Sequence, residues 1–194
     1  MMSPLPGRAV ALLLVVLGFS RAALAADDLA PGKQAALLLR VLPYDRAFSR
    51  RATNTVKIAV VYRGGNLESE TYAIDMATAL RDLARTTAIR NLPVQVISIA
   101  YSSQEEFAAA MARQPLAALY VCPGLVDVLE SITGTTRQSR ILSFSGRERE
   151  VRERLSVGLL RKGARPALIV NLRSSLAEGA DLQPELLALS EVIR

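Results

Sequence analysis

The sequence predicts a single α/β domain, in which a mostly parallel β-sheet carries flanking helices in a Rossmann-like three-layer arrangement. Short, almost wholly apolar runs alternate with helical patterns over residues 33–145, and the connections between them are short. Strands that are buried on both faces read as continuous apolar runs, and strand–helix alternation implies parallel strands with right-handed crossovers. Two later apolar runs flank a polar turn, which adds a C-terminal antiparallel hairpin.

The start of the chain has the pattern of a secretory signal peptide. Arg8 precedes an unbroken apolar run over residues 9–19, and small residues suit cleavage after Ala25. An apolar run of about eleven residues is too short to cross a bilayer, which needs about twenty. We therefore expect residues 1–25 to be a cleaved leader and residues 26–194 to form one α/β domain in the periplasm.

The first part of this domain is expected to hold a helix, a strand and a second helix. Residues 33–48 carry apolar side chains at helical spacing, and Pro43 marks a position where the helix kinks or restarts. Residues 56–62 (VKIAVVY) have the β-branched composition of a buried strand. A glycine pair then leads into a helix that Asn66 or Ser69 can cap.

The middle of the chain repeats this alternation. Strands and helices are expected in turn over residues 92–101, 103–112, 116–122, 125–133 and 140–145. Ser103 and Glu106 have the spacing of a capping box at the start of one helix. Gly134 is expected to end the next helix.

The C-terminal part departs from the alternation. Two apolar runs, over residues 155–160 and 167–172, flank the turn RKGARP and predict a hairpin. A short helix that ends at Gly179 follows. A last amphipathic helix is expected after it, with Asp181 in its cap region and Pro184 in its first turn.

The composition argues against an enzyme and against a nucleic-acid-binding protein. The chain has no His and a single Cys, Cys122, which excludes His-dependent triads, thiolate metal clusters and an internal disulfide. The net charge is +6, but the cations are scattered and only 5% of the residues are aromatic. We expect no catalytic residue, no metal, no cofactor and no nucleic-acid partner. Cys122 fits a buried small hydrophobe, with an intermolecular bridge or a reactive thiol as alternatives.

A candidate ligand crevice lies beyond the carboxyl ends of the parallel strands, where open α/β sheets bind their ligands. The turns after four predicted strands carry small and polar residues: Arg63, Gly64, Gly65, Asn66, Ser102, Ser103, Pro123, Gly124, Ser145, Gly146 and Arg147. A crevice for a small ligand needs such residues, but ordinary tight turns contain them too. The first turn lacks the Walker A and dinucleotide-binding patterns.

The first helix supplies a candidate interface. Leu38, Leu39 and Leu42 form an apolar stripe, and Tyr44 follows it. This stripe can pack either on its own domain or on a second subunit.

The two ends of the domain carry a recognisable set of motifs. Ser-Val-Gly at residues 156–158 opens one strand, and Val-Asn at residues 170–171 closes the next. A small-residue helix over residues 174–177 and a Glu-Leu-Leu helix at residues 185–187 follow, while KQAALLLR stands directly after the leader. In this arrangement the chain resembles the YfiR family of periplasmic proteins.

The resemblance implies a non-enzymatic periplasmic regulator. It implies a homodimer that binds the sensory domain of an inner-membrane signalling protein, a diguanylate cyclase or a sensor kinase, in cyclic-di-GMP signalling. The chain lacks the paired cysteines that family members often carry, and Tyr44 and Phe48 are the aromatic residues of its first helix. A periplasmic protein that binds a small solute is the alternative function, and a small-molecule effector is compatible with both.

Overall fold

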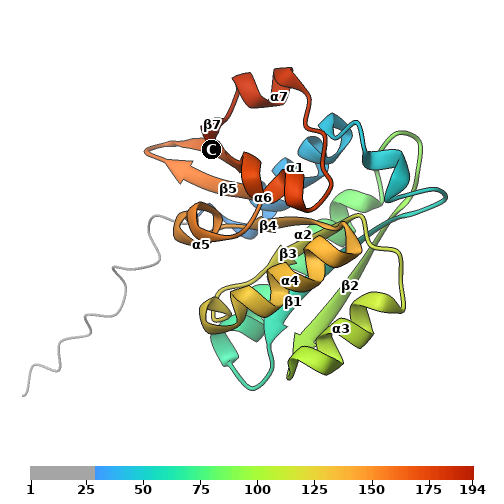
Figure 1. Cartoon of the computed structure of the whole chain (residues 1–194), viewed down its shortest axis with the longest axis vertical. Helices are drawn as coiled ribbons and strands as arrows, with labels where there is room; N and C mark the ends of the chain where they lie inside the picture. Colours follow the sequence, from blue (N-terminus) through green and yellow to red (C-terminus); the bar gives the residue numbers. More distant parts are fainter. Residues whose placement is uncertain (1–28) are drawn as a thin grey trace, which may run out of the picture.

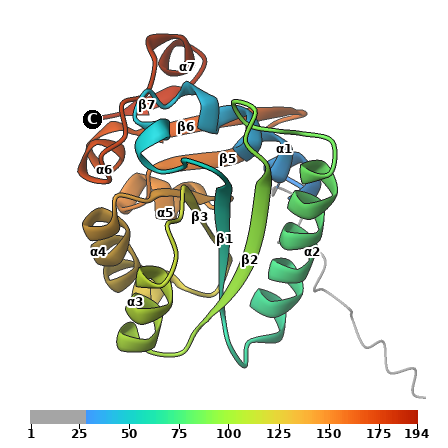
Figure 2. The ribbon, with the colours of Figure 1, turned by 90° about the vertical axis from the view of Figure 1, so that its right-hand side faces the viewer.

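The computed structural model describes residues 29–194, which form one seven-stranded sheet with the order β2-β1-β3-β4-β5-β6-β7 (Figures 1 and 2). The strands are β1 (Val56–Arg63), β2 (Val94–Tyr101), β3 (Ala118–Val121), β4 (Leu142–Ser145), β5 (Val157–Lys162), β6 (Arg165–Asn171) and β7 (Glu191–Ile193). The pairs from β2 to β5 are parallel, β6 is antiparallel to β5, and β7 is parallel to β6. The mostly parallel sheet and the C-terminal hairpin are therefore confirmed, whereas the leader lies outside the described residues.

Helices cover both faces of this sheet. They are α1 (Pro31–Val41), α2 (Leu67–Ala84), α3 (Gln104–Ala112), α4 (Leu129–Ser139), α5 (Glu148–Glu153), α6 (Leu172–Ala177) and α7 (Pro184–Ala188), with single 3₁₀ turns η1 (Leu42–Tyr44), η2 (Phe48–Arg50) and η3 (Val126–Val128). Successive side chains of β1 alternate between the faces. Ile58 and Val60 pack with α1 and α2, and Ala59 and Val61 pack with α3 and α4, which gives three layers (Figure 2).

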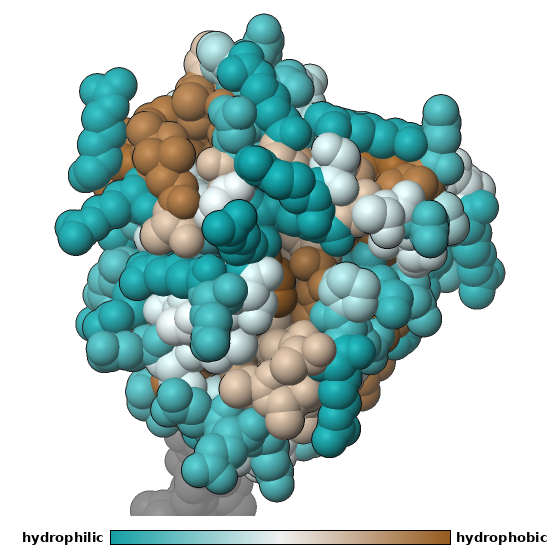
Figure 3. Space-filling view, turned by 45° about the vertical axis from the view of Figure 1, so that its right-hand side comes forward, coloured by the Kyte–Doolittle hydropathy of each residue, from teal (hydrophilic) through white to brown (hydrophobic). Residues whose placement is uncertain are grey.

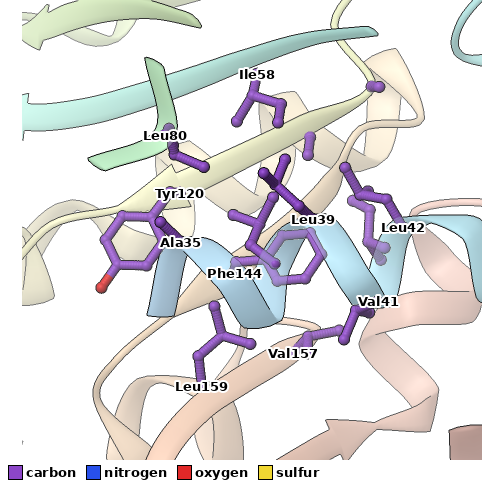
Figure 4. Packing of buried hydrophobic residues seen from close by; sticks show 14 of the residues in the cluster. Ala35, Leu39, Val41, Leu42, Ile58, Leu80, Tyr120, Phe144, Val157 and Leu159 are labelled. Atoms are coloured by element: carbon purple, nitrogen blue, oxygen red, sulfur yellow. The ribbon is translucent and has the colours of Figure 1, made fainter. Parts of the chain in front are cut away.

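The apolar stripe of α1 belongs to the core of its own subunit. Leu38, Leu39 and Leu42 are at most 5% exposed, whereas Tyr44 is 37% exposed. Figure 4 shows labelled side chains of α1 lying against strand residues such as Tyr120. Of the two alternatives for the three leucines, packing on their own domain is therefore the one that the structure shows.

Two helix boundaries differ from the sequence expectation. The first helix ends at Val41, and two 3₁₀ turns replace its expected continuation, because Pro43 in the first turn of η1 cannot donate a backbone hydrogen bond. The fourth helix runs through Gly134 to Ser139 and ends at Arg140, whose φ of 53° is left-handed. A lone glycine inside a helix costs about 1 kcal/mol, which the packing of α4 on the sheet outweighs.

Two elements were not expected. The stretch EREVRE forms the helix α5, supported by the pairs Arg149–Glu153 at 2.7 Å and Glu148–Arg152 at 2.6 Å, each one helical turn apart. The last helix stops at Ala188, and the chain then adds β7 beside β6. Long-range pairing with the sheet decides this last strand, and no local pattern reports such pairing.

Candidate functional site

The four predicted turns meet at one edge of the sheet, which we call the carboxyl edge because β1 to β4 end there. In Figure 2 this edge lies below the strands, opposite the edge that carries α7 and the 3₁₀ turns η1 and η2. β1 has β2 on one side and β3 on the other, so the sheet has its topological switch point between β1 and β3. This is the place where doubly wound sheets bind ligands.

Arg63 occupies this switch point with its own side chain. Its Nε donates to the carbonyl oxygen of Gly124 at 2.9 Å, and its Nη2 forms an ion pair with Asp127. Gly124 has a φ of 91°, and a Cβ there would lie 3.5 Å from Ser69. The turns after β1 and β3 therefore contact each other, and the Arg63 side chain links them.

The turn after β1 is completed by local hydrogen bonds. Oδ1 of Asn66 accepts the amide of Ser69 at 2.9 Å, which identifies Asn66 as the N-cap of α2. The Ser69 hydroxyl accepts the amide of Arg63 at 2.9 Å. The amide of Gly65, at a φ of 75°, donates to Glu70 at 2.8 Å. Gly64 lies exposed between these groups. These backbone amides are thus occupied by the helix start.

In the turns after β2 and β4, polar side chains likewise bond to the start of the helix that follows. Ser103 caps α3 by accepting the amide of Glu106 at 3.2 Å, and the Ser102 hydroxyl donates to the Glu106 carboxylate. After β4, the hydroxyl of Ser145 donates to Glu150 at 2.6 Å.

Two other residues of the candidate crevice lie in the turns after β4 and β3. Arg147 reaches Glu68 at 3.9 Å, which links the turn after β4 to the start of α2. Pro123 is buried directly after Cys122. The structure therefore brings the crevice residues to one edge, where most of them bond to the first turns of the helices that follow.

A buried polar cluster behind this edge contains residues that the sequence analysis did not single out. The Nε2 of Gln34 in α1 donates to the Tyr72 hydroxyl at 2.7 Å and to the Leu29 carbonyl at 2.5 Å, and its Oε1 accepts the Tyr120 hydroxyl at 2.5 Å. The two tyrosine rings stack with centroids 6.2 Å apart. A Cβ on Gly146 would lie 2.6 Å from the Gln34 amide. Gln34 therefore fills the space beside the turn after β4.

Burial keeps the Tyr120 hydroxyl of this cluster and the thiol of the nearby Cys122 in their neutral forms. Burial, together with Tyr72, raises the pKa of Tyr120 well above its ordinary value. Burial and the nearby Glu150 raise the pKa of Cys122 as well. A thiol reacts as the thiolate, so Cys122 is held in its inert form. It occupies the place of a buried small hydrophobe.

Apolar side chains stand exposed on the two turns that contact each other at the carboxyl edge. Leu67, next to the Asn66 cap, is 79% exposed, and Val126, two residues after Gly124, is 52% exposed. The pairs Arg63–Asp127 and Arg147–Glu68 lie beside them. On the face in Figure 3, hydrophilic side chains predominate and hydrophobic surface is confined to separate patches. We call Leu67, Val126 and these two ion pairs the edge patch.

Solved structures with little sequence identity share this α/β fold. A conserved domain protein from Vibrio cholerae matches with a TM-score of 0.60 and 14% identity over 86% of this chain and 61% of that one. The ligand-free, open form of CD0873, a substrate-binding protein with adhesive properties from Clostridium difficile, matches with a TM-score of 0.59 and 12% identity, over 87% of this chain and 61% of that one.

A third match extends this comparison. The ABC domain from Streptococcus pneumonia, in complex with L-Trp, matches with a TM-score of 0.57 and 13% identity, over 84% of this chain and 60% of that one. The chain thus spans about three fifths of the length of these structures. At such identities the likeness shows the fold alone.

The family follows from the sequence model that matches most of the chain. The model described as YfiR/HmsC-like covers residues 33–191, and the chain belongs to this family. The resemblance drawn from the terminal motifs is therefore confirmed. YfiR-like proteins are periplasmic and regulatory rather than catalytic. No curated protein shows significant sequence similarity to the chain. Within residues 29–194, no helix is long and apolar enough to span a membrane.

Proposed function

We propose that this chain is exported by its leader, residues 1–25, and works in the periplasm as a non-enzymatic regulator. It binds the sensory domain of an inner-membrane signalling protein, a diguanylate cyclase or a sensor kinase. One observation carries this proposal: the carboxyl edge is closed by the chain's own side chains, while Leu67 and Val126 remain exposed on it.

The edge patch has the composition of a protein-binding surface. Binding energy in such surfaces concentrates in a few apolar or aromatic anchors that are surrounded by polar groups. Leu67 and Val126 provide the anchors, and the pairs Arg63–Asp127 and Arg147–Glu68 provide both signs of charge around them. By binding one state of the membrane partner better than the other, the chain shifts that partner between its two states.

The experiment measures the affinity of the mature chain for the periplasmic domain of a candidate membrane cyclase or sensor kinase, chosen by the proximity of its gene. Leu67→Glu and Val126→Glu each place a charge in the patch and are expected to weaken binding at least tenfold. Leu189→Glu is the matched control, because Leu189 is 75% exposed and lies after α7. Equal affinity of all three variants would rule out the edge patch, and the absence of any binding would remove the regulator proposal.

A small-solute-binding protein is the alternative function. Two of the similar structures are a substrate-binding protein and a complex with L-Trp, and the turns at the carboxyl edge carry the polar residues that a solute needs. In that case a solute must displace Arg63 from Gly124 and Asp127. Arg63→Ala and Arg147→Ala would then abolish a ligand-dependent rise in melting temperature, with no protein partner required.

We further propose that the chain forms a homodimer through the outer edge of β2. This strand ends the sheet, and its eight residues, VQVISIAY, include no charge and no proline. Charged residues or proline usually protect natural edge strands, because the unpaired backbone groups of an edge can pair with another chain. Antiparallel pairing of two β2 strands about a two-fold axis would satisfy these groups and cover Ile97 and Ile99, which are only partly buried.

Lysine substitution tests the dimer. Ser98 and Ala100 are exposed on β2, so Ser98→Lys and Ala100→Lys are expected to give monomers in sedimentation experiments. Thr78→Lys, which is exposed on α2, adds the same charge away from the edge and should leave the dimer intact. A monomeric native chain, or lysine variants that still dimerise, would contradict this interface.

A further inference from the structure

The opposite edge of the sheet, which we call the amino edge, holds a hollow of about 520 Å³. It lies between η2, the segments that enter β3 and β4, the end of α4 and the turn after α6. Pockets for small molecules commonly have volumes of about 300–1,000 Å³. The hollow is therefore large enough for a compact organic molecule.

Cations line this hollow and carboxylates do not. Arg50, Arg51 and Arg140 contribute to the wall, and no Asp or Glu does. The carboxylates of the two acidic residues that bond to Arg51 are already engaged. Asp45 accepts hydrogen bonds from Arg51 at 3.0 Å and from two backbone amides. The carboxylate of Glu178 is buried and accepts from Thr136 at 2.6 Å and from the amide of Ser143 at 2.8 Å.

Two of the three arginines are left for a ligand. Arg51 is buried, and its Nη groups donate to the carbonyl oxygens of Arg140 and Glu178. Arg50 and Arg140 are exposed, and within residues 29–194 neither guanidinium is paired with a carboxylate. A guanidinium offers a planar set of donors that matches carboxylate and phosphate oxygens.

The backbone at Arg140 is held in a strained conformation. Arg140 follows α4 with φ 53° and ψ 46°, a position that glycine usually occupies because a side chain there costs about 1–2 kcal/mol. Arg51 fixes its carbonyl oxygen, and the stem of Arg140 packs at 3.5 Å from the Cβ position of Gly179. Strain of this kind is found at ligand-binding positions. The arrangement therefore holds a cation where glycine would serve the fold better.

We propose that this hollow binds a small organic anion, a carboxylate or phosphate carried on an apolar group. Arg50 and Arg140 hold the charged end, and Met111, Leu116 and Ile141 form the apolar floor. The site is independent of the edge patch, which lies at the other end of the strands. Whether or not the hollow binds an anion, the regulator proposal is therefore unaffected.

Calorimetric titration with two probes, phenyl phosphate and benzoate, tests the site, with benzyl alcohol as the uncharged control. The native chain is expected to bind at least one anion in the millimolar range or tighter and to bind the alcohol at least tenfold more weakly. Preference for phenyl phosphate would assign the site to phosphate monoesters, and preference for benzoate would assign it to carboxylates.

Arg140→Gly separates binding from folding. This variant removes the guanidinium and relieves the strained backbone, so its melting temperature is expected to equal or exceed that of the native chain while anion affinity falls at least tenfold. Arg50→Gln should weaken binding similarly. Arg149→Gln removes an exposed arginine on α5 and should leave affinity unchanged. Failure of both anions to bind, binding of the alcohol as tightly as the anions, or full affinity in Arg140→Gly and Arg50→Gln would overturn the proposal.

Discussion

At the carboxyl edge, Gln34 bonds to both Tyr72 and Tyr120, and Arg63 is paired with Asp127. At the amino edge, Arg50 and Arg140 border a hollow with no acidic group in its wall. Both edges are rich in arginine and polar groups. They differ in whether those groups are satisfied from within the chain.

This difference shows that the direction of the strands does not by itself tell which edge of the sheet leaves polar groups unpaired. In a parallel sheet the turns at the carboxyl ends gather small and polar residues whether or not a ligand binds there. In this chain α1 crosses the sheet and places Gln34 beside the turn after β4. The helix that precedes the first strand thus fills the place that the fold leaves open.

The largest effect is expected at the amino edge, where Asp45 and Arg51 form a buried ion pair. Asp45→Ala leaves the Arg51 guanidinium buried without its partner and removes the acceptor for the amides of Ala47 and Asp181. Breaking such a pair costs about 3–5 kcal/mol in the free energy of unfolding. Urea denaturation measures this. The control is Asp181→Ala, since that carboxylate is 56% exposed, and a loss as small as the control's would contradict the anchoring role.

The next effect concerns the packing that closes the carboxyl edge. Gly146→Ala should cost about 1–3 kcal/mol, because its Cβ would lie 2.6 Å from Gln34. Gln34→Ala should also destabilise the fold, by about 1–3 kcal/mol, since it leaves Tyr120 without its acceptor.

The double variant sharpens this test. With Gln34 removed, the alanine at 146 has room, so the two losses should fall short of additivity by about 1 kcal/mol or more. Gly134→Ala is the control, because nothing lies within 4 Å of the added Cβ, and it should stabilise α4 by up to about 1 kcal/mol. Strict additivity of the first pair would show that Gln34 does not close this edge.

A smaller effect is a pH dependence at the amino edge. Burial raises the pKa of Glu178 above its ordinary value of 4.5, although hydrogen bonds from Ser156 and Thr136 oppose this. The folded chain therefore holds this proton more tightly than the unfolded chain, and stability falls as pH rises from 4.5 through the raised pKa.

Glu178→Gln removes this contribution. The free energy of unfolding of the variant, measured relative to the native chain, should therefore rise across the same pH range. The exposed Glu185→Gln variant controls for the loss of one acidic side chain. A constant difference between Glu178→Gln and the native chain at all pH values would contradict the raised pKa.

The strands and the meeting of their turns could be predicted because both follow from local patterns. Runs such as VKIAVVY are buried on two faces, and alternation with helices fixes their parallel direction. The burial of Gln34 could have been predicted from the sequence, since it is a polar residue on the same helical stripe as Leu38. Its partner Tyr120 could not be found, because the register of α1 across the sheet is a tertiary property.

The amino-edge hollow could not be predicted from local sequence patterns, because distant segments form it. Arg140 reads as the start of a strand in the sequence, whereas in the structure it ends α4 in a left-handed conformation. Arg50 reads as a cation at a helix end. Only the long-range bonds of Arg51 to the carbonyls of Arg140 and Glu178 bring these segments together.

The proposed regulatory role requires the carboxyl edge to bind a protein domain. Amide chemical-shift mapping on the isotope-labelled mature chain, titrated with the periplasmic domain of the membrane partner, tests it directly. We expect the largest shifts on residues 63–69 and 123–128, which carry Leu67 and Val126. Shifts confined to the amino edge, or none at saturating concentrations of the partner domain, would contradict it.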